Sequence, residues 1–167
     1  MTQQSDLYKD DLVQFFVHHP DRIYTANTQL LERLPEILFQ VQFADLEAAI
    51  HETIEIVQAQ RERMKIIYDI LEAKPCDGSI NGLKGLIDES FEDIKQQQDN
   101  AELRDMSILF YMTNIEALEM ASFQVLQLLA VKIGHDEIKS LIKKNYEDAK
   151  MDKALLLLIT TKYLATV

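Results

Sequence analysis

Several residue types that define other protein classes are scarce in this sequence. Its 167 residues include one cysteine, three prolines, four glycines and no tryptophan. A single thiol, Cys76, cannot form an internal disulfide, and it has no neighbouring base in sequence, so we interpret it as an unreactive loop residue. So few turn-forming residues argue against all-β and α/β folds and favour long helices joined by few connections.

The sequence also has little positive charge and no long apolar run. Its net charge is −11 at pH 7, and Lys143-Lys144 is its only basic cluster. The apolar run Ala154–Ile159 is far shorter than the roughly 20 residues that span a bilayer. No apolar segment follows Met1, so we predict no signal peptide. These observations predict a cytoplasmic protein that binds neither nucleic acid nor membrane.

What the sequence does contain is apolar residues at helical spacing. This periodicity predicts two short helices, over residues 7–18 and 83–97, and four long ones, over residues 21–41, 45–73, 99–133 and 136–164. We expect a break at Pro20, because the residue before proline is biased away from helix. Pro35 is expected to kink the first long helix, and Gly134 to end the third in a left-handed conformation.

Four long helices predict an all-α, antiparallel four-helix bundle. We expect a single domain over residues 1–167, with an irregular start over residues 1–4. The segment 74–97 joins the second and third long helices, which is where a ferritin-like bundle has its long crossover. The expected fold is therefore a ferritin-like bundle with an additional N-terminal helix and a short helix in the central crossover.

Each long helix carries polar residues inside its apolar stripe. They are Asn27 on the first, Thr53 and Gln60 on the second, Glu116 and Glu119 on the third, and Asn145 and Asp152 on the fourth. At about 100° per residue these side chains point into the bundle, so we expect one internal polar layer. Carboxylates buried there must be paired, protonated or bound to metal.

Bundles that hold two iron or manganese ions use glutamates from facing helices together with Glu-x-x-His pairs. Glu116, Glu119 and Asp152 are the candidate metal ligands here. The other candidate donors lie elsewhere: His18, His19 and His135 near helix ends, and His51 and Glu55 on the solvent side. Three interpretations stay open: a hydrogen-bonded polar plug without cofactor, which we favour, one weakly held metal, and a working di-metal centre.

Five segments, in order, resemble motifs of the bacterial YciE/YciF-like ferritin-like proteins. They are Tyr24–Pro35, Gln60–Met64, Gly85–Glu89, Ile115–Phe123 and Glu147–Asp152, similar to the family's "Y-x-A-E-K-Q-L-…-L-P", "G-Q-x-E-R-L", "G-L-I-x-E", "V-E-H-Y-E-I-A-S-Y" and "E-E-E-K-A-T-D". The resemblance covers about residues 7 to 163. It implies a rubrerythrin-like di-metal bundle, often dimeric, that is linked to bacterial stress responses.

The sequence departs from these motifs at the ligand positions. Asn27, Thr53, Ile56, Ala117 and Ala149 stand where the resemblance implies Glu, His, Glu, His and an acidic residue. Glu116 and Glu119 are kept, and Asp152 is a neighbour of a motif position. A degenerate di-metal site is therefore expected.

The leading hypothesis is a stress-associated protein without catalysis, acting through its surface as a homodimer. Phe15, Phe16, Phe39 and Phe43 are aromatic residues that could form a partner surface or pack in the core. The alternative is an oxidase- or peroxidase-type enzyme that uses Glu116, Glu119 and Asp152 to hold iron or manganese. A third hypothesis, iron storage, needs a shell-forming oligomer.

Overall fold

A computed structural model describes residues 2–75, 82–97 and 99–165, with side chains from Asp11 onward. Met1 and Cys76 lie outside the described residues. The described part contains five helices and no strand: α1 (Thr2–Leu38), α2 (Ala44–Ile70), α3 (Leu83–Gln96), α4 (Ala101–Ile133) and α5 (Asp136–Leu164). The predicted all-α fold is confirmed.

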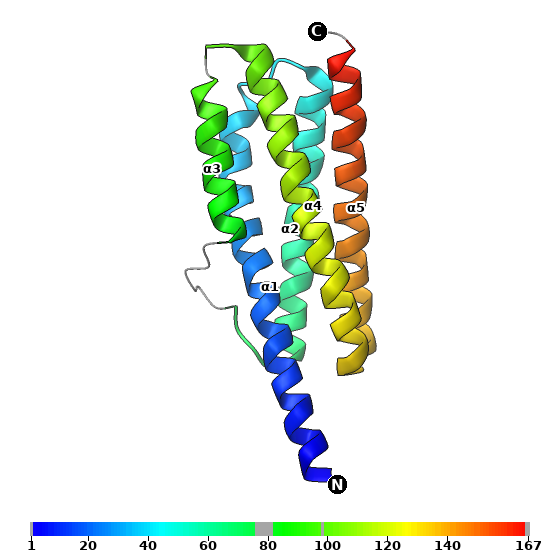
Figure 1. The fold of residues 1–167 in the computed structure, drawn as a ribbon. Coiled ribbons are helices and arrows are strands. Elements are labelled where there is room, and N and C mark those ends of the chain that lie inside the picture. Colours follow the sequence, from blue (N-terminus) through cyan, green and yellow to red (C-terminus); the bar gives the residue numbers. More distant parts are fainter. Residues whose placement is uncertain (1, 76–81, 98, 166–167) are drawn as a thin grey trace.

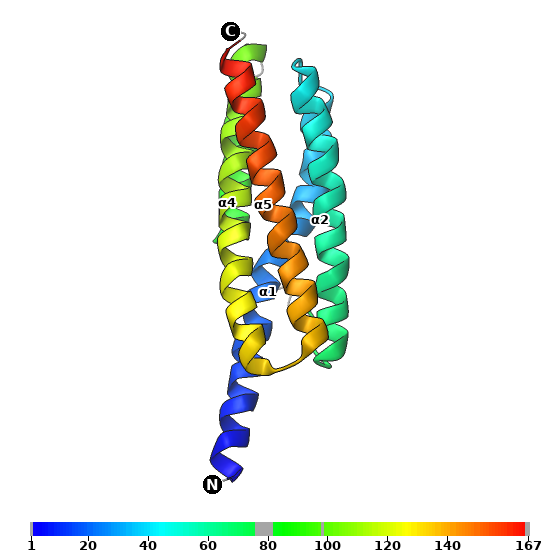
Figure 2. The ribbon, with the colours of Figure 1, turned by 90° about the vertical axis from the view of Figure 1, so that its right-hand side faces the viewer.

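The four long helices lie side by side, and α3 covers α1 and α4 from outside (Figure 1). Along the bundle, α1 and α5 run in one direction and α2 and α4 in the other (Figures 1 and 2). The connection from α2 to α4 therefore spans the length of the bundle, and α3 lies within it, as the ferritin-like prediction required. Gly134 ends α4 with φ of 80°, in the left-handed region that was predicted.

The break expected at Pro20 is absent, because α1 is one helix from Thr2 to Leu38 and includes both Pro20 and Pro35. The expected separate N-terminal helix is thus the first part of α1, and residues 2–4 are helical. Proline inside a helix loses one hydrogen bond, at a cost of about 3 kcal/mol. Burial of Pro20 itself, together with Phe16 and Ile23, offsets that cost. The first turns of α1 extend beyond the other helices (Figures 1 and 2).

The core consists of two apolar clusters, one toward each end of the bundle. One contains Leu30, Leu34, Val57, Met112 and Leu156, and the other contains Phe16, Met64, Phe123, Ile142 and Ala149. On every long helix, at least one polar residue singled out in the sequence lies where one cluster gives way to the other: Asn27, Gln60, Glu116 and Asp152. Thr53 lies within the first cluster and Asn145 within the second, so the polar layer is about two helical turns thick. This layer is the candidate site.

The connection between α1 and α2 is held by the start of α4. Asp105 is buried, and its carboxylate accepts the backbone N–H groups of Phe43 at 2.9 Å and of Gln42 at 3.1 Å. Phe43 precedes α2 and supplies no side-chain cap. A carboxylate at a helix N-terminus also interacts favourably with the positive end of the helix dipole. Asp105 thus does from a distant helix what a local capping residue does elsewhere.

Replacing Asp105 with alanine should lower the free energy of unfolding by about 1–3 kcal/mol, because two backbone donors lose a charged acceptor. Asp105→Asn keeps an acceptor oxygen and should lose less. Urea denaturation of both variants checks this order. If the alanine and asparagine variants both had nearly the same free energy of unfolding as the natural protein, water would be an adequate substitute for the carboxylate.

The aromatic residues considered for a partner surface divide between core and surface. Phe16 is fully buried, and Phe43 packs against Tyr163 with ring centroids 5.1 Å apart. Phe15 and Phe39 are exposed. No helix in the described ranges is both long enough and apolar enough to cross a bilayer.

Candidate functional site

The candidate site is the polar layer between the two core clusters. It contains all seven residues predicted for it, each of them buried: Asn27, Thr53, Gln60, Glu116, Glu119, Asn145 and Asp152. Their distribution over the helices is uneven. The three acids come from α4 and α5, whereas α1 and α2 contribute only amides and a hydroxyl. The layer therefore has an acidic half and a neutral half.

In the acidic half, the three carboxyl groups share few donors. The Thr53 hydroxyl donates to Asp152, at 2.8 Å from Oδ2 and 3.0 Å from Oδ1. Glu116 and Asp152 are within hydrogen-bonding reach of each other, which requires a proton on one of them. Both oxygens of Glu116 and Oε2 of Glu119 have no donor from another group, although they are buried. These carboxyls can remain in the core only if protons or a cation neutralise them.

Burial raises the pKa of all three acids. Desolvation, followed by the charges of Glu119 and Asp152, raises the pKa of Glu116 well above its ordinary value. Desolvation and the charge of Asp152 raise the pKa of Glu119 to about 8. For Asp152, desolvation raises the pKa to about 6, even though the Thr53 hydrogen bond opposes the shift. The raised pKa values therefore favour the protonated form of Glu116 and Glu119, and Asp152 is the most acidic of the three by the smaller rise in its pKa.

In the neutral half, amide groups connect three helices. Asn27 and Gln60 are joined across α1 and α2, with Asn27 Nδ2 at 3.1 Å from Gln60 Oε1. In the opposite amide orientation, which satisfies more groups, Asn27 Nδ2 donates to Glu119 Oε1 at 2.6 Å and to the Ile23 carbonyl at 3.1 Å. In the first orientation, Gln60 Nε2 also donates to the Asn145 carbonyl at 3.4 Å. Asn27 and Gln60 thus complete the layer without adding charge.

Arg63 connects this layer to the surface, and sequence reasoning did not assign it to the site. It donates from Nη1 to Asn145 Oδ1 at 2.6 Å, and its Nη2 lies 2.6 Å from Asp148 Oδ2. Its side chain is 12% exposed. The spacing of Arg63 could have indicated this position, because Arg63 follows Gln60 by three residues and so lies near the same face of α2.

The predicted solvent-facing positions of His51 and Glu55 are confirmed. His18 and His135 are exposed, and His19 lies beside Phe15 on α1. Tyr111 of α4 points away from the layer and donates to Asp93 of α3. Ile56, at one of the ligand positions implied by the resemblance, is partly exposed. No histidine therefore reaches the polar layer.

The residues present do not match the requirements of a di-metal centre. Two divalent ions need ligands from facing helices, and here α1 and α2 offer Asn27, Gln60 and Thr53 in place of anionic or imidazole donors. Within the described ranges, no three His, Cys, Asp or Glu side chains are arranged as a metal-binding group. The oxygens of Glu116 and Glu119 that lack a donor can be explained by protonation of these carboxyl groups, which their raised pKa values favour.

Comparison with known proteins places this chain in a family. YciF of Escherichia coli K12 is 27% identical over 136 residues, which are 81% of each chain. The crystal structure of the E. coli stress protein YciF shares the fold, with a TM-score of 0.86, 22% identity, and coverage of 93% of this chain and 98% of that one.

A second solved structure, YcfI of Rhodopseudomonas palustris, has a TM-score of 0.75 at 26% identity and covers 86% of this chain and 92% of its own. The family model described as "Domain of unknown function (DUF892)" matches residues 11–166, nearly the whole chain. The chain is therefore a member of the DUF892 family, the family of YciF-like bundles.

Proposed function

We propose that this protein is a cytoplasmic, non-catalytic bundle that acts through its surface as a homodimer under stress, with a degenerate metal site. The stress context follows from the relative that is described as a stress protein. The absence of catalysis follows from the composition of the polar layer. Binding to nucleic acid or membrane has no support in a chain with a net charge of −11.

The observation that carries the proposal is the division of the layer into an acidic and a neutral half. A di-metal site places its cations between ligands of opposing helices, so that each ion meets several negative charges. Here Asn27 and Gln60 hydrogen-bond to each other across α1 and α2, and the acids face them from α4 and α5. The amides can satisfy protonated carboxyl groups, and they cannot balance two divalent ions.

The dimer proposal comes from the outer face of α4. Its exposed large apolar residues extend along most of the helix: Leu103, Phe110, Leu118, Val125, Leu128 and Val131. Between Leu103 and Val131, every charged residue of α4 is buried. Two copies of so acidic a chain repel each other, and this uncharged strip is where they can approach at least cost. An apolar strip of this extent marks an interaction surface.

The extent of this face is sufficient for a stable pair. From Leu103 to Val131 the helix is about 43 Å long at 1.5 Å per residue. With its flanks it offers on the order of 800 Å² per copy, the size of a standard interface. A groove of about 500 Å³ on one side is lined by Leu118, Ala121 and Val125, and a groove of about 340 Å³ on the other side by Phe110 and Leu157.

The two grooves are offset along α4 in a way that suits a twofold axis. If two α4 helices pair antiparallel about the level of residue 116, Phe110 of one protomer lies at the level of residue 122 of its partner. That is the level of the larger groove, whose lining includes Ala121 and Ser122. The same contact then forms twice, as a symmetric pair requires.

Metal analysis tests the proposed loss of the di-metal centre. Protein expressed with excess iron and manganese and purified without chelators should retain neither in stoichiometric amount. As a positive control, Asn27→Glu combined with Thr53→His and Ala117→His restores three donors that the resemblance implies, and this variant should retain metal. Two tightly held ions per natural chain would overturn the proposal.

The second candidate is the oxidase- or peroxidase-type enzyme, with iron or manganese held by Glu116, Glu119 and Asp152. The unpartnered oxygens of Glu116 and Glu119 favour it, because hard cations prefer such donors. The enzyme hypothesis predicts that Glu116→Ala reduces both the metal content of the purified protein and its consumption of peroxide. If neither changes, the enzyme hypothesis is excluded.

A further inference from the structure

A groove along α1 is lined by no residue of the polar layer or of α4, so it lies outside the proposed dimer face. It has a volume of about 530 Å³ and is formed by α1, α2 and the start of α3. Its lining includes Arg33 of α1, Arg61 of α2 and Lys84 of α3. Three of the chain's 17 lysines and arginines therefore meet in one groove of an acidic protein.

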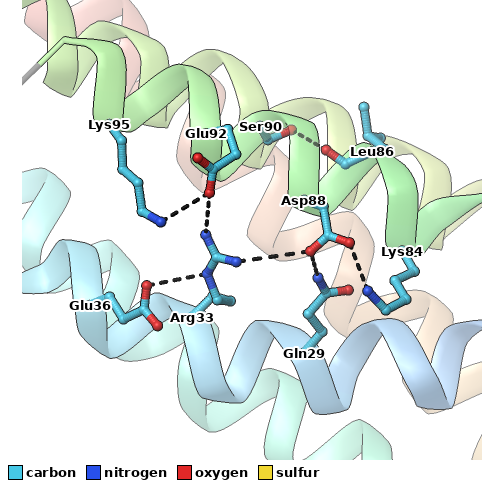
Figure 3. Close-up of polar contacts among 9 residues, drawn as sticks. All are labelled: Gln29, Arg33, Glu36, Lys84, Leu86, Asp88, Ser90, Glu92 and Lys95. Carbon is cyan, nitrogen blue, oxygen red and sulfur yellow. Dashed lines mark hydrogen bonds and ion pairs between the residues drawn. The ribbon is translucent and has the colours of Figure 1, made fainter.

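Two of these cations are held by carboxylates on the groove's rim. Figure 3 shows Asp88 between Arg33 and Lys84, with distances of 3.9 Å to Arg33 Nη1 and 2.7 Å to Lys84 Nζ. Arg33 also faces Glu36 at 3.2 Å and Glu92 at 3.6 Å. These contacts position Arg33 and Lys84 and largely balance their charges.

Arg61 differs from both of them. It forms no ion pair with any described carboxylate, whereas Arg33 and Lys84 each do. Its Nε, like that of Arg33, is buried without a hydrogen-bond partner. A buried donor without an acceptor costs about 1–3 kcal/mol, so native structures rarely leave one unsatisfied. The planar guanidinium suits a carboxylate or phosphate group. Arg61 therefore supplies the groove with a guanidinium group that no described carboxylate pairs directly, although Glu32 lines the same groove and Glu62 is its neighbour in sequence.

Gln29 adds an unsatisfied acceptor to the same groove. Its side-chain nitrogen donates to Asp88, which fixes the amide orientation (Figure 3). Its Oε1 is buried and has no partner. A ligand that satisfies both residues must offer an anionic oxygen to Arg61 and a hydroxyl to Gln29.

We propose that this groove binds a small hydroxylated anion, a phosphate or carboxylate on a polyol skeleton. The anionic group binds Arg61, with Lys84 on the facing helix, and a ligand hydroxyl donates to Gln29 Oε1. The ligand must be small, because Glu32, Glu36 and Glu92 flank the site and would repel an extended polyanion. At physiological salt, charge attraction is confined to about 8 Å, so the net charge of −11 does not prevent local binding.

Calorimetric titration of the full chain with four probes tests the proposal. Glycerol 3-phosphate should bind more tightly than inorganic phosphate, which has no polyol, and glycerol should not bind. Glycerate carries a carboxylate in place of the phosphate, so its affinity relative to glycerol 3-phosphate identifies the anion. Absence of saturable binding by both glycerol 3-phosphate and glycerate would overturn the proposal.

Variants assign the binding to this groove. Arg61→Gln should weaken binding by at least about tenfold, the typical effect of losing a charged hydrogen bond. Gln29→Met should remove the preference for glycerol 3-phosphate over inorganic phosphate. Lys139→Gln, on α5 and away from the groove, should bind like the natural protein.

If Arg61→Gln does not fold, the exposed Lys84 provides the same test through Lys84→Gln. Circular dichroism of each variant establishes whether it is folded. Equal affinity of the natural protein and of the folded variants would refute the site. The proposed loss of the di-metal centre and the proposed dimer do not depend on this result.

Discussion

Glu119→Gln is expected to make the metal-free protein more stable than the natural sequence at pH 8 and to leave its stability near pH 4 almost unchanged. Glutamine mimics the protonated carboxyl group that the folded state requires. The buried Glu119 has its pKa raised to about 8 from an ordinary value of 4.5. Asp152 and Glu116 face it, Asn27 is its neutral neighbour, and no described cation contacts it.

The sign follows from proton linkage. Below pH 4.5 the carboxyl is protonated in both the folded and the unfolded chain, so the buried group causes no penalty. Between pH 4.5 and 8 the unfolded chain releases this proton and the folded chain retains it, so stability falls by about 1.4 kcal/mol per pH unit. The penalty reaches about 4 kcal/mol at pH 8, and the glutamine variant should avoid most of it.

Urea unfolding at pH 5, 6.5 and 8 measures the effect as a difference between the two stability curves. The curves should diverge as the pH rises. Glu55→Gln, at an exposed position of α2, is the matched control and should follow the natural curve. Parallel curves for Glu119→Gln and the natural protein would mean that Glu119 is ionised in the fold and balanced by a cation.

Phe110→Asp is expected to convert a dimer into a monomer. Phe110 is 60% exposed on the uncharged face of α4, so the substitution should leave the fold intact. In the proposed pair it replaces an apolar contact in the partner's groove with a carboxylate, twice per dimer. Loss of a central aromatic contact together with burial of a charge should weaken association by at least about 30-fold.

Sedimentation equilibrium measures this change directly. Phe39→Asp is the matched control, because Phe39 is 90% exposed in the α1–α2 connection, away from the α4 face. It should dimerise like the natural protein. A natural protein that stays monomeric at high micromolar concentration, or a Phe110→Asp variant that still dimerises, would exclude this face as the interface.

The polar layer could be predicted from sequence because it depends on one property, the position of polar residues within regular helices. Asn27, Glu116 and Asp152 each interrupt an apolar stripe at helical spacing, and packing brings such stripes together. Sequence reasoning was wrong at Pro20. There the preference of proline to end a helix was overridden by burial in the core cluster that contains Phe16. Local rules predict poorly when tertiary packing opposes them.

Two features were beyond the sequence for different reasons. The outer face of α4 was missed because this helix is apolar on nearly all sides, and periodicity alone cannot separate a buried side from an exposed one. The groove around Arg61 was missed because its walls come from three helices, and its character depends on which cations Asp88 already binds. Neither the packing nor the pairing of charges can be read from spacing along a single helix.

The bond from Asp105 to the α1–α2 connection also has a consequence for how the chain folds. During synthesis, residues 39–43 are complete about sixty residues before Asp105 is made. Until then, the N–H groups of Gln42 and Phe43 have only water as a partner. The first helical pair can therefore collapse early but cannot reach its final turn geometry alone. We expect the two halves of the bundle to gain their stability together, in one cooperative transition.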